Sequence, residues 1–274
     1  MTFTHWKGKT ALVTGASAGI GAAMARRLAA GGCNLVLTAR RRERLEALAL
    51  ELSSRHGVRA DVVPADLADP AGAQRLADAL RALGRSIDLL INNAGLGRSG
   101  AFENGAWEQD LEMMQLNMVS PVHLTRLLLP QMIDRGAGDI LITASIAAYL
   151  PIPTFAVYSA SKAFVKSFGE ALGFELRGTG VRVCVVSPGG TATEFAQVGG
   201  FTLGRMARMG TMSADKVAAI ALAAMARGRR SVVAGGGNWL AATLARSLPL
   251  PVQLRAANAF QRIAGGRDTP RRAA

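Results

Sequence analysis

Cysteine and aromatic residues are scarce in this sequence, which limits the classes of protein that it can represent. The 274 residues include only two cysteines, Cys33 and Cys184, far apart in the chain and each within an apolar run. Two distant buried thiols do not make a disulfide framework, so we expect a reducing, cytoplasmic compartment. Aromatic residues make up 5% of the chain and hydrophobic residues 50%. This composition predicts one large domain with a core of aliphatic side chains.

Membrane-spanning runs and metal-ligand clusters are also lacking. Residues 140–161 carry no formal charge, but Pro151, Pro153 and several hydroxyl side chains argue against a lipid-facing helix. The glycines after the first basic residues argue against a secretory signal. The three histidines share no ligand spacing with the cysteines, so no metal site is expected (His5, His56, His123).

Acidic residues are scarce in the last third of the chain. Residues 196–274 contain 12 Lys and Arg but only two Asp and Glu, whereas residues 1–195 contain 20 and 17. Most of the net charge of +13 therefore lies in the C-terminal part. This asymmetry favours a nearly neutral catalytic body with a basic extension. No nucleic-acid-binding motif accompanies the charge, so we expect no nucleic-acid partner.

The hydrophobic pattern indicates an α/β fold with a doubly wound parallel sheet. Short aliphatic runs alternate with segments of helical periodicity, which is typical of βαβ units. The predicted strands are Ala11–Thr14, Asn34–Thr38, Val58–Val63, Leu89–Asn92, Asp139–Thr143 and Val181–Val186, with a last strand at Arg230–Ala234. The predicted helices cover residues 20–31, 42–55, 70–83, 107–134 and 157–177. The ligand of such a sheet lies beyond the carboxyl ends of the strands.

The pattern becomes less regular after residue 195. We place a main domain at residues 1–235 and a basic helical extension with a tail at residues 236–274. Within the main domain, the methionine-containing residues 195–212 are candidates for a substrate lid. The basic extension has three alternatives: a solvated helical face, a lid over an apolar substrate, or weak peripheral attachment to an anionic membrane.

Glycines follow the first predicted strand, where the chain turns into a helix. The stretch reads Thr14-Gly15-Ala16-Ser17-Ala18-Gly19-Ile20-Gly21. Gly15 permits a tight turn, Gly19 lets the backbone approach a pyrophosphate, and Gly21 lets the helix pack close to the strand. The N–H groups of the helix N-terminus add positive potential. This loop, with Ser17 and Ile20, therefore predicts a dinucleotide site.

The end of the second predicted strand indicates NADP(H) as the cofactor. An acidic residue there would bind the ribose hydroxyls, but the chain reads Thr38-Ala39-Arg40-Arg41-Arg42. Arg40 and its neighbour Arg41 can pair with a 2′-phosphate through charge-assisted hydrogen bonds, whereas Arg42 suits the start of a solvated helix. Asp66 is placed to meet the adenine ring. The segment Asn92-Asn93-Ala94-Gly95 is placed beside the adenosine ribose.

Tyr158 and Lys162 lie four residues apart, on one face of a predicted helix. A free tyrosine has a pKa of about 10, too high for efficient proton exchange at neutral pH. A nearby ammonium stabilises the phenolate, so we expect Lys162 to lower the pKa of Tyr158. Ser145, at the end of the fifth strand, can hydrogen-bond a substrate oxygen. Asn117, in the preceding helix, can hold a water next to the lysine.

In this order, these motifs resemble those of the short-chain dehydrogenase/reductase family. The shared set also includes Pro188-Gly189 leading to Thr193, and the resemblance covers residues 7–235. It implies a Rossmann-type domain, a nicotinamide cofactor and the interconversion of a small-molecule carbonyl and alcohol. It implies that Tyr158 donates the proton and Lys162 binds the nicotinamide ribose. The carboxamide of the nicotinamide would be held by the segment from Pro188 to Thr193, which includes Gly189 and Thr191.

The substrate is less defined by the sequence than the chemistry. Residues 144–147, 157–164 and 170–172 resemble a subgroup of reductases that act on bulky or lipid-like ketones. A 3-oxoacyl thioester reductase and a non-catalytic NADP(H)-binding regulatory protein are the alternatives. We expect a homodimer or homotetramer. A dimer through the helices near 107–134 and 157–177 is favoured, since the C-terminal extension departs from the shorter tetramer-forming members.

Overall fold

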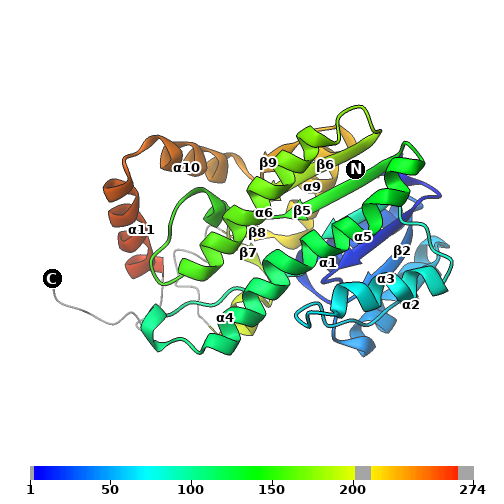
Figure 1. Ribbon diagram of the computed structural model, residues 1–274, viewed down its shortest axis with the longest axis horizontal. Helices are drawn as coiled ribbons and strands as arrows, with labels where there is room; N and C mark the ends of the chain where they lie inside the picture. The colour runs from blue at the N-terminus through cyan, green and yellow to red at the C-terminus, as the bar shows by residue number, and fades with distance from the viewer. Residues whose placement is uncertain (1–2, 201–210, 265–274) are drawn as a thin grey trace.

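Seven parallel strands form the central sheet of the computed structural model, which describes residues 3–200 and 211–264 (Figure 1). Their order is β3-β2-β1-β4-β5-β6-β9, so the strand order reverses between β1 and β4. The strands are β1 (Thr10–Thr14), β2 (Asn34–Thr38), β3 (Ala60–Val62), β4 (Leu89–Asn92), β5 (Gly138–Thr143), β6 (Val181–Ser187) and β9 (Ser231–Val233). The predicted doubly wound α/β fold is confirmed.

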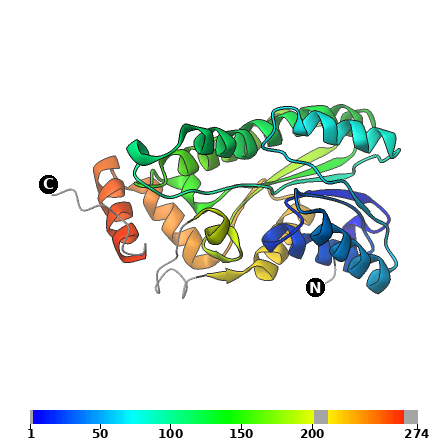
Figure 2. The ribbon, with the colours of Figure 1, turned by 90° about the horizontal axis from the view of Figure 1, so that it is seen from below.

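Helices cover both faces of the sheet, as Figure 2 shows. One layer contains α1 (Gly19–Ala30), α2 (Arg42–His56) and α9 (Ala214–Ala226). The other contains α3 (Gly72–Ala82), α5 (Ser120–Asp134) and α6 (Ala156–Glu175), with α4 (Trp107–Met114) leading into α5. Short 3₁₀ turns lie at Thr4–Trp6, Phe102–Asn104 and Ile146–Tyr149.

Because both faces are covered, every residue of β1 is buried, and successive side chains enter two different cores. Ala11 and Val13 pack in the core beneath α1, α2 and α9. Leu12 packs in the other core, with residues of α3, α5 and α6. Burial of a leucine or valine side chain contributes about 1.5–3 kcal/mol, so the continuous apolar runs that predicted these strands also stabilise the sheet.

Two predicted elements differ from those observed. The strand predicted at Val58–Val63 is reduced to three residues in β3, which pairs only with β2 at the edge of the sheet. The helix predicted over 107–134 is interrupted by a π-helical turn, Gln115–Val119. Pro121 has no N–H to donate to the carbonyl of Asn117, so the regular α-helical hydrogen-bond pattern cannot continue through this turn.

The segments beyond β6 include a small second sheet and the C-terminal helices. Strands β7 (Thr191–Ala192) and β8 (Met212–Ser213) pair in parallel, and α7 (Phe195–Val198) follows β7. The extension, which was expected to be helical, contains α10 (Gly236–Ser247) and α11 (Leu250–Ala264). Most of the predicted lid and the tail lie outside the described residues. None of the described helices combines the length and apolar character needed to cross a bilayer.

The segment before β1 is fixed at the amino ends of the strands. Trp6 is fully buried, and its indole Nε1 donates to Asp139 Oδ2 at 2.7 Å. Arg182 donates to both oxygens of the same carboxylate, at 2.8 and 2.9 Å. These bonds join the N-terminal turn to β5 and β6 at the amino ends of the strands, on the side of the sheet opposite to the cavity.

Candidate active site

A cavity of about 570 Å³ lies at the carboxyl ends of the central strands, where the doubly wound fold places its ligands. The loops after β1, β2, β4, β5 and β6 form its walls, and Gln261 of α11 also contributes. The predicted site residues in the lining are Gly15, Ser17, Gly19, Ile20, Arg40, Arg41, Asp66, Ala94, Gly95, Ser145, Tyr158, Lys162, Pro188, Gly189, Thr191 and Thr193. Predicted site residues as far apart in the sequence as Gly15 and Thr193 thus share one cavity.

Three predicted site residues do not line the cavity. Gly21 is covered by the glycine loop, where a Cβ would clash with the carbonyl oxygen of Gly15. Asn92 is buried, and its amide donates to Thr125 Oγ1 at 3.0 Å, which fixes β4 to α5. Asn92 therefore does not lie beside a cavity ligand as we expected, because its side chain points into the protein. Asn117 lies behind the cavity wall.

Asn117 connects three segments beneath the cavity. Its Nδ2 donates to the carbonyl of Leu96 at 2.8 Å and to Ser161 Oγ at 3.0 Å. Its Oδ1 accepts from the N–H of Leu96 at 2.9 Å. A Cβ on Gly95 would lie 3.1 Å from Asn117 Oδ1 and 3.2 Å from Lys162 Nζ. The loop after β4 is therefore fixed close to the lysine.

The glycine loop is held across the reversal in strand order by Thr14. Its hydroxyl donates to the carbonyl of Ile91 at 3.0 Å and accepts from the N–H groups of Asn93 and Ala94, both at 2.9 Å. Gly15 has a φ of +68°, and a Cβ there would lie 2.9 Å from the Cα of Ala94. Sequence analysis did not assign Thr14 and Asn93 to this contact, because it joins residues almost 80 positions apart.

The N-terminus of α1 faces the cavity and is suited to binding an anion. Ala18, Gly19 and Ile20 line the cavity, and the N-cap residue Ala18 provides no side-chain hydrogen bond to the helix. The first turn of α1 contains no acidic residue. Its N–H groups and positive potential therefore fit the phosphates of a dinucleotide.

The arginines after β2 take different positions. Arg41 donates through Nη2 and Nε to Ser17 Oγ, at 3.1 and 3.3 Å, so a cation and a hydroxyl meet beside the glycine loop. Arg40 is half exposed and pairs with Glu112 of α4 at 3.2 Å. Arg42 begins α2 and pairs at the surface with Glu46, in line with the solvated role expected for it. This geometry places Arg41, more than Arg40, next to Ser17.

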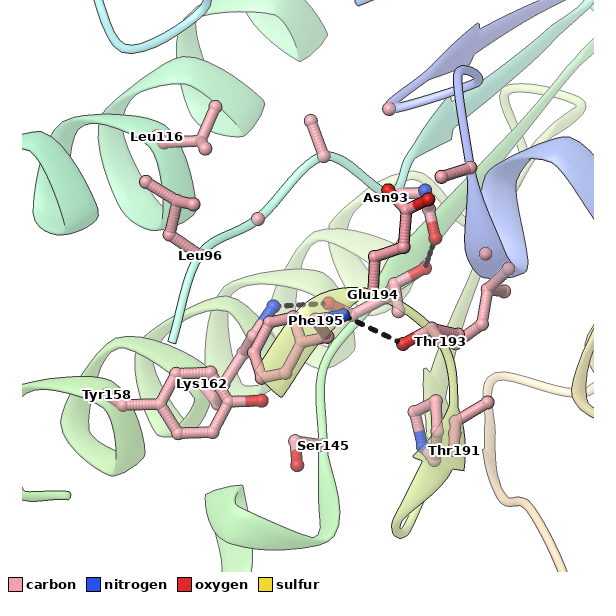
Figure 3. Close-up of a pocket in the computed structure, with 18 of the residues that line it drawn as sticks. Asn93, Leu96, Leu116, Ser145, Tyr158, Lys162, Thr191, Thr193, Glu194 and Phe195 are labelled. Atoms are coloured by element: carbon pink, nitrogen blue, oxygen red, sulfur yellow. Dashed lines mark hydrogen bonds between the residues drawn. The ribbon is translucent and has the colours of Figure 1, made fainter. Parts of the chain in front are cut away.

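Figure 3 shows the Tyr158 hydroxyl directed towards Ser145, with Lys162 behind it. The side chain of Ser145 caps a 3₁₀ turn, where its Oγ accepts from the N–H of Ala147 at 3.1 Å. Lys162 Nζ donates to the carbonyl of Thr143 at 3.1 Å and lies 5.9 Å from the centre of the Tyr158 ring. These side chains come from the loop after β5 and from the first turns of α6.

Burial dominates the acid–base properties of this pair. It raises the pKa of Tyr158 to about 12, and the hydrogen bond with Ser145 offsets only part of the effect. It lowers the pKa of Lys162 to about 8. The expected lowering of the Tyr158 pKa by Lys162 is therefore not found in this structure, where burial raises that pKa and the ammonium is bonded to the Thr143 carbonyl.

Apolar and acidic residues that sequence analysis missed complete the cavity. The apolar side chains near Tyr158 are Leu96, Leu116, Ile146, Ile152, Phe155 and Phe195. Glu194 lies near the other end, where its carboxylate pairs with Arg41 at 2.8 Å and with Arg44 at 2.7 Å. Phe195 begins the predicted lid and Leu116 lies in a predicted helix, but neither assignment identifies the partners of these side chains.

Comparisons with known proteins agree with this geometry. Residues 9–199 match the family model for short chain dehydrogenase. Sulfoacetaldehyde reductase 2 of Chromohalobacter salexigens is 42% identical over 192 residues, which cover 68% of this chain and 74% of that protein. A short-chain dehydrogenase from Sphingobium yanoikuyae in complex with NADPH has a TM-score of 0.78 and 33% identity, covering 87% of this chain and 94% of that one. The bulky-bulky ketone specific alcohol dehydrogenase from Comamonas testosteroni has a TM-score of 0.74 and 31% identity, covering 93% and 98%.

Proposed function

Because this chain belongs to the short-chain dehydrogenase/reductase family, we propose that it reduces a bulky, apolar ketone or aldehyde reversibly, with NADPH as the reductant. The observation that carries the proposal is the meeting of Tyr158, Ser145 and Lys162 in the cavity that also contains the glycine loop and Arg41. The proton-transfer group and a binding site large enough for the cofactor thus lie in one continuous cavity.

The bound nicotinamide would supply the hydride, and the protein would supply the proton. Ser145 holds the carbonyl oxygen by a hydrogen bond, and Tyr158 gives its hydroxyl proton to that oxygen as the alcohol forms. A Tyr158 pKa of about 12 keeps the phenol protonated at neutral pH, which is the form that reduction requires. Lys162, with a pKa of about 8, is placed to stabilise the phenolate that remains.

The shape and polarity of the cavity favour an apolar substrate. Leucine, isoleucine and phenylalanine side chains surround Tyr158, and among the described lining residues the cations are Arg40, Arg41 and Lys162. Both arginines belong to the loop after β2, away from Tyr158. Among the described lining residues, Lys162 is therefore the one cation outside that loop, which does not favour a sulfonated aldehyde, the substrate in the name of one relative.

The preference for NADP(H) is supported by the sequence at the end of β2, Thr38-Ala39-Arg40-Arg41-Arg42, which contains arginines and no acidic residue. Arg41 and Ser17 offer a guanidinium and a hydroxyl at one point of the cavity wall, and such charge-assisted hydrogen bonds are the strong ones in anion recognition. The NADPH found in one similar structure is in keeping with this preference.

The deciding experiment measures oxidation of NADPH, with NADH in parallel, against a panel of carbonyl compounds. The panel runs from small and sulfonated aldehydes to bulky aryl ketones, steroids and 3-oxoacyl thioesters. We expect turnover with NADPH and bulky apolar ketones, and a loss of at least about a hundredfold in Tyr158→Phe, because general acids contribute on this scale. Preference for acyl thioesters would select the 3-oxoacyl alternative. Tight NADPH binding without turnover on any member would select a regulatory protein.

The two arginines after β2 can be separated by single substitutions. We expect Arg41→Ala to weaken NADPH binding by at least about tenfold and to leave NADH within about twofold, because hydrogen bonds to charged groups contribute about 1.5–3 kcal/mol. Arg40→Ala should have the smaller effect, since Arg41 is the arginine that is hydrogen-bonded to Ser17 beside the glycine loop. Titration of both cofactors by protein fluorescence or calorimetry measures these affinities. Equal losses for NADPH and NADH would remove Arg41 from the 2′-phosphate site.

A further inference from the structure

The carboxylate of Glu194 forms ion pairs with the arginines that would bind a 2′-phosphate. It accepts from Arg41 Nη1 at 2.8 Å and from Arg44 Nη1 at 2.7 and 2.9 Å. The Arg41 guanidinium also contacts Ser17 through its other nitrogens. Glu194 lines the same cavity as Ser17 and Arg41. A carboxylate of the protein thus occupies part of an anion site.

We propose that Glu194 determines cofactor specificity by competing with the 2′-phosphate for Arg41 and Arg44. The inference rests on the proposed preference for NADP(H). A phosphate and a carboxylate use the same planar guanidinium donors, so the two anions cannot both bind Arg41 Nη1 in full. Since Glu194 is part of the chain, it competes at a high effective concentration, and each 2′-phosphate that binds must displace it.

The hydrogen bonds from Arg41 and Arg44 also keep Glu194 in its anionic form. They hold the pKa of its carboxyl below the usual range, so Glu194 carries its charge at neutral pH. Both ion pairs are partly exposed to solvent, and pairs of this kind contribute little individually. The competition is therefore weak enough for a phosphate to displace Glu194. It is strong enough to reduce the affinity of the protein for the 2′-phosphate measurably.

Glu194 is joined directly to residues at the catalytic end of the cavity. The next residue, Phe195, has its ring centre 5.7 Å from that of Tyr158. The ring also packs against the loop after β4, where a Cβ on Gly97 would clash with it. Figure 3 shows Glu194 and Phe195 side by side between Asn93 and Tyr158. Displacement of Glu194 by the phosphate therefore also releases the segment that covers Tyr158.

The competition can be measured without any turnover, with fragments of the cofactor. Isothermal titration calorimetry compares adenosine 2′,5′-bisphosphate, which carries the 2′-phosphate, with adenosine 5′-monophosphate, which lacks it. In Glu194→Gln we expect the bisphosphate to bind about fivefold more tightly than in the wild type, and the monophosphate to stay within about twofold. Glu46→Gln is the matched control, because it removes a carboxylate from Arg42 at the surface of α2 and leaves the pairs of Glu194 with Arg41 and Arg44 unchanged.

The outcomes separate this inference from the proposed cofactor preference. If the wild type binds both nucleotides equally, the preference for NADP(H) fails, and the role of Glu194 fails with it. If the wild type prefers the bisphosphate but Glu194→Gln binds it no more tightly, only the role of Glu194 is overturned. An equal gain in Glu46→Gln would also overturn it, since the effect would then be one of net charge.

The connection to Tyr158 has its own measurement. We expect hydrogen–deuterium exchange of the amides in residues 193–199 to accelerate when the bisphosphate is added to the wild type, and not when the monophosphate is added. In Glu194→Gln the same amides should exchange fast without any nucleotide. Exchange that is the same in all of these samples would overturn the release of the segment that carries Phe195.

Discussion

Lys162 is a cation held almost entirely out of solvent. Its side chain is 5% exposed, its ammonium is bonded to the carbonyl of Thr143, and burial lowers its pKa to about 8 from an ordinary value of 10.5. The shift indicates that the folded protein is less stable at neutral pH than it would be with a neutral side chain at this position. Such destabilisation is common where a residue is retained for its chemistry.

Lys162→Met should therefore lose turnover and gain stability. The folded-state pKa lies below the unfolded one, so the unfolded chain binds more protons between pH 8 and 10.5. The wild type should gain stability relative to Lys162→Met as the pH rises through this window, and the variant should be the more stable protein at pH 7, by up to about 3 kcal/mol. Urea unfolding of both proteins at several pH values measures this difference.

Lys166→Met is the matched control for that experiment, because Lys166 lies one turn further along α6 and pairs with Glu170 near the surface. It removes the same charge from the same helix, so a difference between the two variants belongs to the position of Lys162. A Lys162→Met protein that is less stable than the wild type at neutral pH would mean that the bond to Thr143 outweighs the burial of the charge.

Among the elements, the π-helical turn Gln115–Val119 has the most direct connection to the site. It places Asn117 where its amide satisfies both backbone groups of Leu96 and the hydroxyl of Ser161. Asn117→Ala would leave several buried polar groups unpaired, which costs about 1–3 kcal/mol for each group. We expect a loss of at least about 2 kcal/mol in the free energy of unfolding, together with a lower kcat.

Gln115→Ala, in the same turn, controls for a general loss of helical packing, since within residues 3–200 and 211–264 its side chain makes no hydrogen bond to the loop after β4. Urea unfolding and steady-state kinetics of the two variants give the comparison. If Asn117→Ala were as stable and as active as Gln115→Ala, Asn117 would have no positioning role.

The observed strands and helices also show which parts of the fold could be predicted from the sequence. The buried strands β1, β2 and β4 were predicted to within a residue, because apolar runs in a covered parallel sheet are continuous. The edge strand β3 was predicted too long, because an apolar run at an edge need not be paired along its whole length. The π-helical turn was missed, since a few residues of π-helix keep nearly the same apolar spacing as α-helix. Its one local signal is Pro121.

For the site, motifs identified the residues that a local pattern can mark. The glycine loop and the Tyr158–Lys162 spacing follow from local geometry, and both lie in the cavity. The pairing of Glu194 with Arg44, 150 positions away, depends on where two loops meet in three dimensions. The balance of burial and charge at Tyr158 likewise depends on packing, which explains why its pKa was predicted in the wrong direction.

At the scale of the whole molecule, exposed large apolar side chains lie on the layer formed by α4, α5 and α6 and on the C-terminal helices α10 and α11. Trp107, Leu111, Val119, Phe164 and Phe174 are all exposed on the layer of α4, α5 and α6. We propose that this layer is the dimer interface, since burial of such side chains is the main favourable contribution to association.

Phe164→Lys should therefore convert a dimer into a monomer, which halves the mass measured by sedimentation equilibrium. Leu50→Lys places the same charge on an exposed position of α2, in the opposite layer, and should leave the mass unchanged. A Phe164→Lys protein that remains dimeric at micromolar concentration would place the interface elsewhere. The solvated and membrane-bound alternatives for the basic extension stay predictions, while Gln261 brings α11 to the cavity wall.

The anchoring of Trp6 on Asp139 has a practical consequence for attaching the protein to a solid support. Because these bonds fix the first described residues at the amino ends of the strands, a linker on that side leads away from the cavity. A bead or electrode joined there would hold the molecule with its cavity open to the solution. A linker placed after α11 would instead emerge beside Gln261, where the surface of the support would obstruct the entry of substrate.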